Sequence, residues 1–166
     1  MSRIVMIGAK GIELTKISEK FESRPYLCPA GVWTQGYGNT RNPDTRERIT
    51  RTSPPINLAT AERWLIDSYK KVYAPIADEL TRDDLQQHEF DAIADFVFNT
   101  GGYFLDKRSG RRFPYRLFQL VNNRASPEEM RAYWTTCAIT AGGKRLNGLV
   151  TRRRREVDLY LNGDWK

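Results

Sequence analysis

The pattern of the chain changes at Asn57, and this change constrains the fold more than any other feature. Residues 39–55 are polar and contain turn-forming residues, and short stretches at 31–38 and 47–50 predict two strands. From Asn57 onward the apolar residues recur at helical spacing, which predicts helices for the rest of the chain. The sequence therefore predicts an α+β fold with a small β-rich lobe, a larger helical lobe and a cleft between them.

Six helices are expected, and the first of them belongs with the β-rich lobe. They span residues 11–21, 57–80, 83–98, 115–122, 127–139 and 149–161. Asn57 is the expected N-cap of the second helix, and the Asn-Thr-Gly-Gly run at 99–102 is expected to stop the third. We expect residues 1–166 to form a single domain, with the first helix and β lobe at about 11–56 and the helical lobe at about 57–166.

The charge balance narrows the choice of partner. The chain has 27 Lys and Arg residues against 20 Asp and Glu residues, which gives a formal net charge of +7. Such a surface attracts nucleic acid, membrane lipid or an acidic wall polymer, and charge alone does not choose among them. The apolar run at 4–7 is too short for a membrane span or a signal segment, so we expect a cytosolic protein unless another factor releases it.

Cysteine and histidine are too scarce to define a site by themselves. Cys28 and Cys137 are too few for a disulfide scaffold, and at most a single disulfide joins them. The one histidine, His88, excludes most His-based metal sites and is expected to be a surface or capping residue.

Two glycine and arginine motifs have simpler explanations than ligand binding. The Gly36-x-Gly38 pair lacks the third glycine and the following helix of a dinucleotide fingerprint, because Arg41 stands at that position. Both glycines are therefore expected in tight turns. The four arginines at 152–155 point all round a helix and cannot form one binding stripe. We interpret them as a solvated helical face rather than a nucleic-acid site.

Three chemically competent side chains follow one another where the first helix leads into the β lobe. Glu19 lies in the last turns of the expected helix, where the helix dipole and partial burial both disfavour ionisation of a carboxyl group. A retained proton is what a general acid requires near neutral pH. Cys28 and Thr34 lie on the loop and strand that follow, so the three groups can converge in a cleft. The alternative is a surface glutamate, a buried cysteine and a strand threonine.

The spacing of these residues closely resembles that of phage-type lysozymes, the endolysins of tailed bacteriophages grouped in glycoside hydrolase family 24. Glu19, Cys28 and Thr34 fit the pattern Glu-x8-(Asp or Cys)-x5-Thr. Tyr26 stands two positions before the cysteine, and Thr-x-Gly-Tyr-Gly begins at Thr34. Further blocks that resemble the family lie at 90–101, 141–144 and 148–153, with Glu156. The resemblance covers nearly the whole chain from about Gly11.

Three departures from the family pattern bear on the site. The family commonly has glycine after the catalytic glutamate, where this chain has Lys20. It commonly has histidine where this chain has Asn39, so a lobe-bridging ion pair is expected to be absent there. Glu22, in a Phe-Glu-Ser context, is an alternative acid, but it would shorten the spacing to Cys28, and we therefore prefer Glu19.

The resemblance implies a muramidase that cuts the β-1,4 bond between N-acetylmuramic acid and N-acetylglucosamine in bacterial peptidoglycan, with inversion of the anomeric centre. It implies Glu19 as the acid, Cys28 as a group that positions or activates water, and Thr34 as the residue that holds this water. No metal or organic cofactor is implied. A thiol is a weaker base than the carboxylate that relatives often carry, unless its pKa is depressed.

The same resemblance implies host-cell lysis at the end of a phage cycle. The enzyme is expected to be a monomer that accumulates in the host cytoplasm, without stable membrane insertion or bound nucleic acid, until a separate holin lets it reach the cell wall. Two alternatives remain at this stage, a lytic transglycosylase and a non-enzymatic DNA-binding helical protein. The first needs only the acid and leaves 1,6-anhydro ends, and the second binds DNA with a steep dependence on salt.

Overall fold

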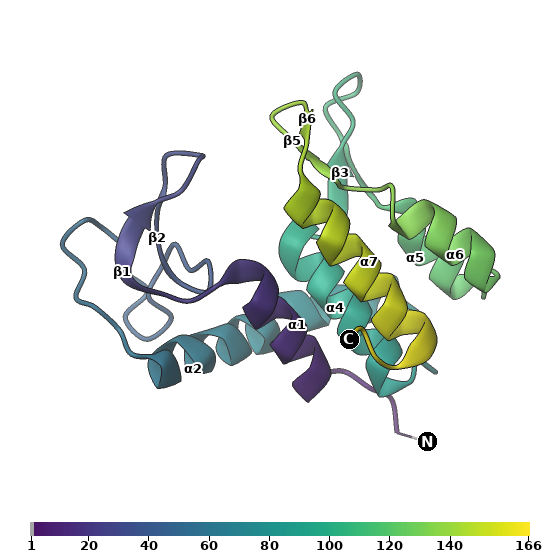
Figure 1. The fold of residues 1–166 in the computed structure, drawn as a ribbon, viewed down its shortest axis with the longest axis horizontal. Coiled ribbons are helices and arrows are strands. Elements are labelled where there is room, and N and C mark those ends of the chain that lie inside the picture. Colours follow the sequence, from purple (N-terminus) through teal and green to yellow (C-terminus); the bar gives the residue numbers. More distant parts are fainter. Residues whose placement is uncertain (1) are drawn as a thin grey trace.

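Helix α4 (Gln87–Thr100) lies at the centre of the helical lobe, and every residue from Phe90 to Val97 is buried. The computed structural model describes residues 2–166 and shows other helices arranged around α4 (Figure 1). The remaining helices are α1 (Ala9–Glu19), α2 (Leu58–Ser68), α3 (Ala74–Leu80), α5 (Arg116–Asn122), α6 (Pro127–Trp134) and α7 (Asn147–Asn162). Helices α1, α3 and α7 contact α4, and Trp134 of α6 packs edge-on against Phe96. One buried helix therefore organises the core.

Both ends of α4 are fixed by groups that satisfy its free backbone atoms. At the start, the backbone N–H of Gln86 donates to Glu89 Oε2 at 2.7 Å, which completes a capping box. At the end, Gly101 adopts a left-handed conformation with φ of +77°. The predicted stop at 99–102 is confirmed. The predicted start at Asp83 is too early, because the capping box lies further along the chain.

The helix predicted over 57–80 changes its geometry in the middle. Asn57 caps α2, since its Oδ1 accepts a hydrogen bond of 2.8 Å from a backbone N–H three residues later, so this expectation is confirmed. A π-helical segment, Tyr69–Tyr73, then leads into α3. Pro75 has no N–H to donate, which accounts for a change of hydrogen-bond pattern just before it. The segment places Tyr69 fully inside the core.

The small lobe contains one antiparallel hairpin and a long loop. Strands β1 (Glu22–Leu27) and β2 (Trp33–Gly36) pair with Tyr26 opposite Thr34. The sequence pattern predicts a strand at 31–38 but does not identify β1, which contains Pro25. Pro25 lies where the pairing register shifts, which is a position where a strand tolerates proline.

The returning strand predicted over 47–50 does not form. Only one isolated bridge occurs there, between Arg41 and Arg48. The side-chain oxygen of Asn42 accepts hydrogen bonds from two backbone N–H groups that follow it, and Arg46 adopts a φ of +65°. Because these backbone N–H groups bond to a side chain within the turn, they are not available to pair with another strand. The turn also reverses the chain before a longer pair of strands can form.

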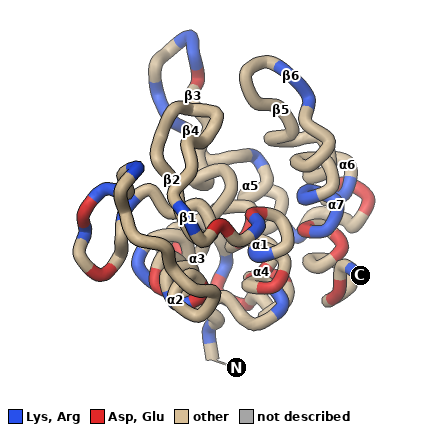
Figure 2. Tube along the Cα trace, turned by 60° about the vertical axis from the view of Figure 1, so that its left-hand side comes forward, with Lys and Arg blue, Asp and Glu red and all other residues tan. Residues whose placement is uncertain are grey.

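Two further hairpins interrupt the helical lobe, so the expectation that everything after residue 57 is helical is wrong. Their strands are β3 (Tyr103–Leu105), β4 (Arg112–Pro114), β5 (Thr140–Ala141) and β6 (Lys144–Arg145). Both hairpins project from the same side of the lobe, and Lys and Arg gather toward their tips (Figure 1, Figure 2). The helix predicted over 127–139 ends at Trp134, and positive φ angles at Gly142 and Gly143 form the turn of the last hairpin.

The cysteines and the single histidine have simple surroundings in the fold. Cys28 and Cys137 are both free thiols, so the single disulfide that the sequence allows does not form. His88 Nδ1 lies 3.0 Å from the carbonyl oxygen of Leu159 near the end of α7, in agreement with a capping role. No helix within residues 2–166 is both long enough and apolar enough to cross a membrane.

Candidate active site between the lobes

Glu19 is the last residue of α1. The helix ends there because Lys20 adopts a φ of +60°, a conformation that glycine takes most easily, which gives a physical reason for the glycine common in the resembling family. The Glu19 side chain is 24% exposed, and its Oε1 accepts a hydrogen bond from Arg152 Nη1 at 2.5 Å. Its Oε2 faces Gly38 in the β lobe, where an added Cβ would lie 3.7 Å away. Glu19 therefore lies where the two lobes meet.

Arg152 holds Glu19 from inside the protein. Its Nε and Nη2 each lie 2.9 Å from an oxygen of Asp95, which forms a two-pronged ion pair. Thr15 Oγ1 lies 2.6 Å from both Asp95 Oδ1 and the Tyr69 hydroxyl oxygen. Burial favours the neutral form of Asp95, but the charge and hydrogen bonds of Arg152 outweigh burial and lower the pKa of this carboxyl group. The proposed acid thus rests on a buried, fully bonded cluster.

Arg153 forms a second buried pair on the same helix. Its Nη2 lies 2.6 Å from Glu156 Oε1, and Trp134 Nε1 donates to the other oxygen of Glu156 at 2.7 Å. The guanidinium carbon of Arg153 lies 4.8 Å from the centre of the Phe96 ring. Burial raises the pKa of Glu156 to about 8, against the opposing charge of Arg153.

The interpretation of residues 152–155 as a solvated helical face is therefore wrong for Arg152 and Arg153. Both are buried, because the Asp95 carboxylate binds Arg152 and Glu156 accepts a hydrogen bond from Arg153, which offsets the cost of removing a guanidinium group from water. Arg154 is exposed, and Arg155 lies over the Trp165 ring at 5.7 Å. Half of the arginine run is thus part of the core.

Cys28 and Thr34 lie close together on the β1–β2 hairpin. The backbone N–H of Cys28 donates to the carbonyl oxygen of Val32 at 3.0 Å, and the Thr34 hydroxyl donates to the same oxygen at 3.0 Å. Hydrogen bonds from the backbone of Val32 and Ala30 lower the pKa of the Cys28 thiol. Thr34 is buried, whereas Cys28 is partly exposed.

Tyr26 connects this pair to Glu19. It lies opposite Thr34 in the hairpin, and burial together with the nearby charges of Glu19 and Cys28 raises its pKa. The structure therefore brings Cys28 and Thr34 together on one hairpin, and the charge of Glu19 acts on the Tyr26 phenol of the same hairpin. Glu22, the alternative acid, is exposed at the start of β1.

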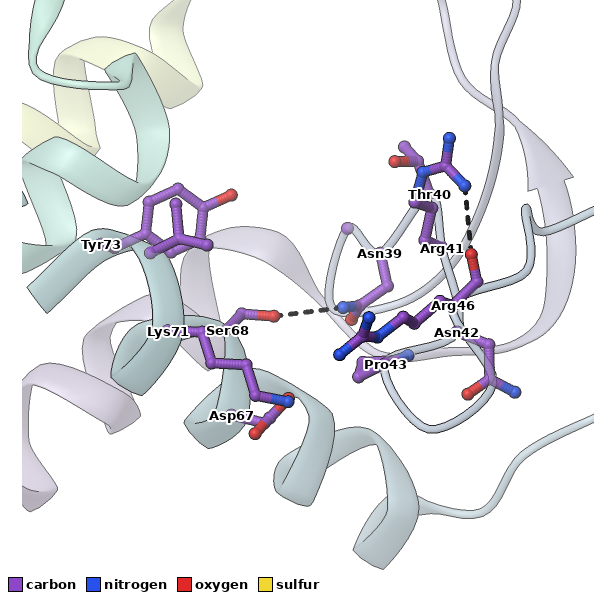
Figure 3. A pocket seen from close by; sticks show the side chains of 12 residues that line it. Asn39, Thr40, Arg41, Asn42, Pro43, Arg46, Asp67, Ser68, Lys71 and Tyr73 are labelled. Carbon is purple, nitrogen blue, oxygen red and sulfur yellow. Dashed lines mark hydrogen bonds and ion pairs between the residues drawn. The ribbon is translucent and has the colours of Figure 1, made fainter.

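A pocket of about 590 Å³ opens between the long loop of the β lobe and the helix that connects the lobes (Figure 3). It is lined by residues 38–43, Arg46, Asp67, Ser68 and 71–73. Asn39 Nδ2 donates to Ser68 Oγ at 3.3 Å from one wall to the other. The ion pair expected to be absent at Asn39 is thus replaced by an uncharged hydrogen bond.

Sequence reasoning missed the polar cluster beneath Glu19. Thr15, Asp95 and Tyr69 come from three separate segments, so no spacing in the sequence relates them. One local signal was present, because Asp95 stands within the apolar pattern of α4, and a charge in such a position indicates a buried partner. Within residues 2–166, no group of three or more His, Cys, Asp or Glu side chains is placed to hold a metal ion.

Solved phage endolysins share this fold. The endolysin of Escherichia coli O157:H7 phage FAHEc1 superposes with a TM-score of 0.78 at 23% identity, over 100% of this chain and 99% of that protein. The active form of the P1 phage endolysin gives a TM-score of 0.74 at 23% identity, over 95% of this chain and 85% of that protein. These likenesses define the fold as lysozyme-like and confirm the expected fold class.

Similarity in sequence also identifies the family to which the chain belongs. The phage lysozyme family pattern matches residues 16–156. An endolysin of Acyrthosiphon pisum secondary endosymbiont phage 1 is 30% identical over 158 residues, which cover 93% of this chain and 97% of that protein. The chain belongs to the phage lysozyme family and is a glycoside hydrolase of the lysozyme type. The expected family is confirmed, and the alternative of a non-enzymatic DNA-binding protein is not supported.

Proposed function

We propose that the chain hydrolyses the β-1,4 bond between N-acetylmuramic acid and N-acetylglucosamine in peptidoglycan, with Glu19 as the general acid. One observation carries this assignment: Arg152 holds one carboxyl oxygen of Glu19 from the interior, while the other faces Gly38, which lines the pocket. A carboxyl group fixed in this way can deliver a proton to the departing glycosidic oxygen without reorientation. The exposed Glu22 has no such position.

Cys28 and Thr34 act on the attacking water in this proposal. Because the Thr34 hydroxyl donates its proton to Val32, its oxygen remains free to accept a hydrogen bond from the water. The lowered pKa of the Cys28 thiol supports a role as the group that activates or positions this water beside the oxocarbenium-like centre. Attack from the face opposite the leaving group inverts the anomeric carbon.

The biological role that fits this chemistry is lysis of a bacterial host by a phage. In this proposal residues 1–166 act as one catalytic domain and as a monomer. The enzyme accumulates in the host cytoplasm, a separate holin gives it access to the wall, and it then acts on the glycan strands. The net charge of +7 supports attraction to a wall rich in carboxylate and phosphate.

Mass spectrometry of digested peptidoglycan tests the reaction directly. Hydrolysis adds one water across each cut bond and leaves reducing ends, so each product is heavier by one water than the 1,6-anhydro product of a lytic transglycosylase. We expect the hydrated products alone from the full chain. Products with 1,6-anhydro ends would show that the chain is a lytic transglycosylase and would contradict the proposed hydrolysis.

A further inference from the structure

The pocket beside Glu19 is lined by three basic side chains and one acidic side chain. Arg41 and Arg46 come from the loop of the β lobe, and Lys71 and Asp67 come from the connecting helix. Lys71 and Asp67 pair with each other at 2.7 Å, so their charges balance. Neither arginine forms an ion pair with any other residue in the range 2–166. The pocket therefore carries two uncompensated positive charges.

The loop's own nearby acid does not neutralise these arginines. Asp44 lies between them in the sequence, but its carboxylate binds the guanidinium of Arg63 at 2.6 and 2.8 Å and accepts a hydrogen bond from Trp64 Nε1 at 3.1 Å. The bonds from Arg63 and Trp64 lower the pKa of Asp44 to about 2. Asp44 thus stays ionised and bound to α2, outside the residues that line the pocket.

The loop orients the guanidinium group of Arg41. Arg41 Nη1 donates to the backbone carbonyl oxygen of Arg46 at 3.1 Å. Arg46 adopts a φ of +65°, which residues other than glycine seldom take. Figure 3 shows the Arg46 side chain extending from the loop toward the helix that carries Asp67 and Lys71. A guanidinium group that is already oriented loses less side-chain entropy when it binds an anion.

One end of the same pocket adjoins the proposed acid. Gly38 lines the pocket and faces Glu19 Oε2. Tyr73 lines it from the helix, and burial together with the charge of Glu19 raises the pKa of its phenol. A polymer that is cut at Glu19 therefore has a flanking unit within reach of Arg41 and Arg46.

We propose that Arg41 and Arg46 bind a carboxylate of the stem peptide that substitutes the glycan strand, next to the bond that is cut. This inference rests on the proposed function, because peptidoglycan carries free carboxylates on the peptide attached to each muramic acid. Guanidinium groups match a carboxylate in both charge and geometry. The pocket thus favours peptide-bearing glycan over bare glycan.

The test compares two substrates that differ only in the peptide. Soluble peptide-bearing glycan fragments are divided, and an amidase removes the peptides from one half. The lactyl carboxylates that this hydrolysis exposes are then converted to methyl amides, so that the bare glycan carries no carboxylate in place of the peptide. The variant Arg41→Gln/Arg46→Gln should raise KM about tenfold on the peptide-bearing substrate, leave kcat nearly unchanged, and leave both constants unchanged on bare glycan. The control Arg24→Gln/Arg51→Gln removes two exposed charges from the same lobe outside the pocket and should change neither substrate. Equal effects on both substrates, or equal effects of both variants, overturn the inference.

A binding measurement keeps this inference separate from the proposed function. Free stem peptide is titrated into the wild type and both double variants and followed by calorimetry, which requires no turnover. Binding that is lost in Arg41→Gln/Arg46→Gln and kept in Arg24→Gln/Arg51→Gln supports the inference, whereas equal binding in all three proteins overturns it. A wild type that releases no reducing ends from either glycan contradicts the proposed function alone.

Discussion

Arg152 Nη1 and Glu19 Oε1 lie 2.5 Å apart, although 133 positions separate the two residues in the chain. The pair joins the end of the first helix to the last helix, and Asp95 of α4 binds the other edge of the same guanidinium group. The orientation of the proposed acid therefore depends on how α1, α4 and α7 pack together. In the proposed mechanism, the β1–β2 hairpin contributes Cys28 and Thr34.

Replacing Arg152 with methionine tests the buried cluster. We expect Arg152→Met to lower the free energy of unfolding by about 3–5 kcal/mol, because Asp95 is left charged and buried without its partner. Arg154→Met is the matched control, since Arg154 is exposed on the same helix, and it should change stability by less than about 0.5 kcal/mol. Urea denaturation of the three proteins measures both values. Similar stabilities for the two variants would contradict a structural role for the buried pair.

Glu19→Gln tests the assignment of the acid. The change keeps the shape of the side chain and removes the transferable proton, so the rate of wall lysis should fall at least ~100-fold. Circular dichroism should show an intact fold. Glu22→Gln is the control, because Glu22 is exposed at the start of β1 and should be dispensable. An inactive Glu22→Gln beside an active Glu19→Gln would move the site to Glu22.

The pH dependence of stability should report on Glu156. Burial raises its pKa in the folded protein to about 8, whereas an exposed glutamate titrates near pH 4.3. Between these two values the unfolded chain has released the proton and the folded chain retains it. The contribution of Glu156 to stability is therefore complete below about pH 4 and falls as the pH rises toward 8.

Glu156→Gln removes this titration and keeps the shape of the side chain, with one oxygen that can still accept the hydrogen bond from Arg153. The free energy of unfolding should fall less between pH 5 and pH 8 in this variant than in the wild type. Glu79→Gln, which removes an exposed carboxylate on α3, should preserve the wild-type slope. Parallel curves for Glu156→Gln and the wild type would show that Glu156 does not titrate in this range.

The sequence predicts those parts of this fold that depend on local spacing. Asn57 caps its helix and Gly101 ends α4 because neighbouring atoms alone determine these features. The hairpin that contains Pro25 is not predictable in the same way, because the bulge that accommodates the proline depends on pairing with β2. Patterns of hydrophobicity also do not reveal hairpins as short as β5–β6.

In the candidate site, too, only the residues that are close in sequence could be predicted to lie together. Cys28 and Thr34 lie six positions apart on one hairpin, so the sequence alone brings them near each other. Arg152 belongs to a run of four similar residues, and nothing in that run distinguishes the buried members from Arg154. Only the packing of α7 against α4 decides which guanidinium groups meet carboxylates. Long-range ion pairs of this kind need the three-dimensional structure.

The reactivity of the two cysteines should differ, because their surroundings shift their pKa values in opposite directions. Hydrogen bonds from Val32 and its neighbours lower the pKa of the Cys28 thiol, while burial raises the pKa of Cys137 to about 12. A thiol-alkylating reagent at neutral pH should therefore modify Cys28 first and stop lysis. Mass spectrometry of the modified peptides identifies the site. Lysis by Cys28→Asp should resist the reagent, which makes this variant the matched control.

The same position decides what the thiol contributes to turnover. Cys28→Asp should retain much of the lysis rate, because a carboxylate then occupies the place where relatives often carry aspartate, whereas Cys28→Ser should impair turnover because a hydroxyl barely ionises. The lysis rate is measured per folded molecule, so that a loss of stability is not mistaken for a loss of chemistry. Full activity in Cys28→Ser would show that Cys28 takes no part in the mechanism. Glu19 would then act with Thr34 alone, because the Thr34 hydroxyl donates to Val32 and its oxygen can still accept a hydrogen bond from water.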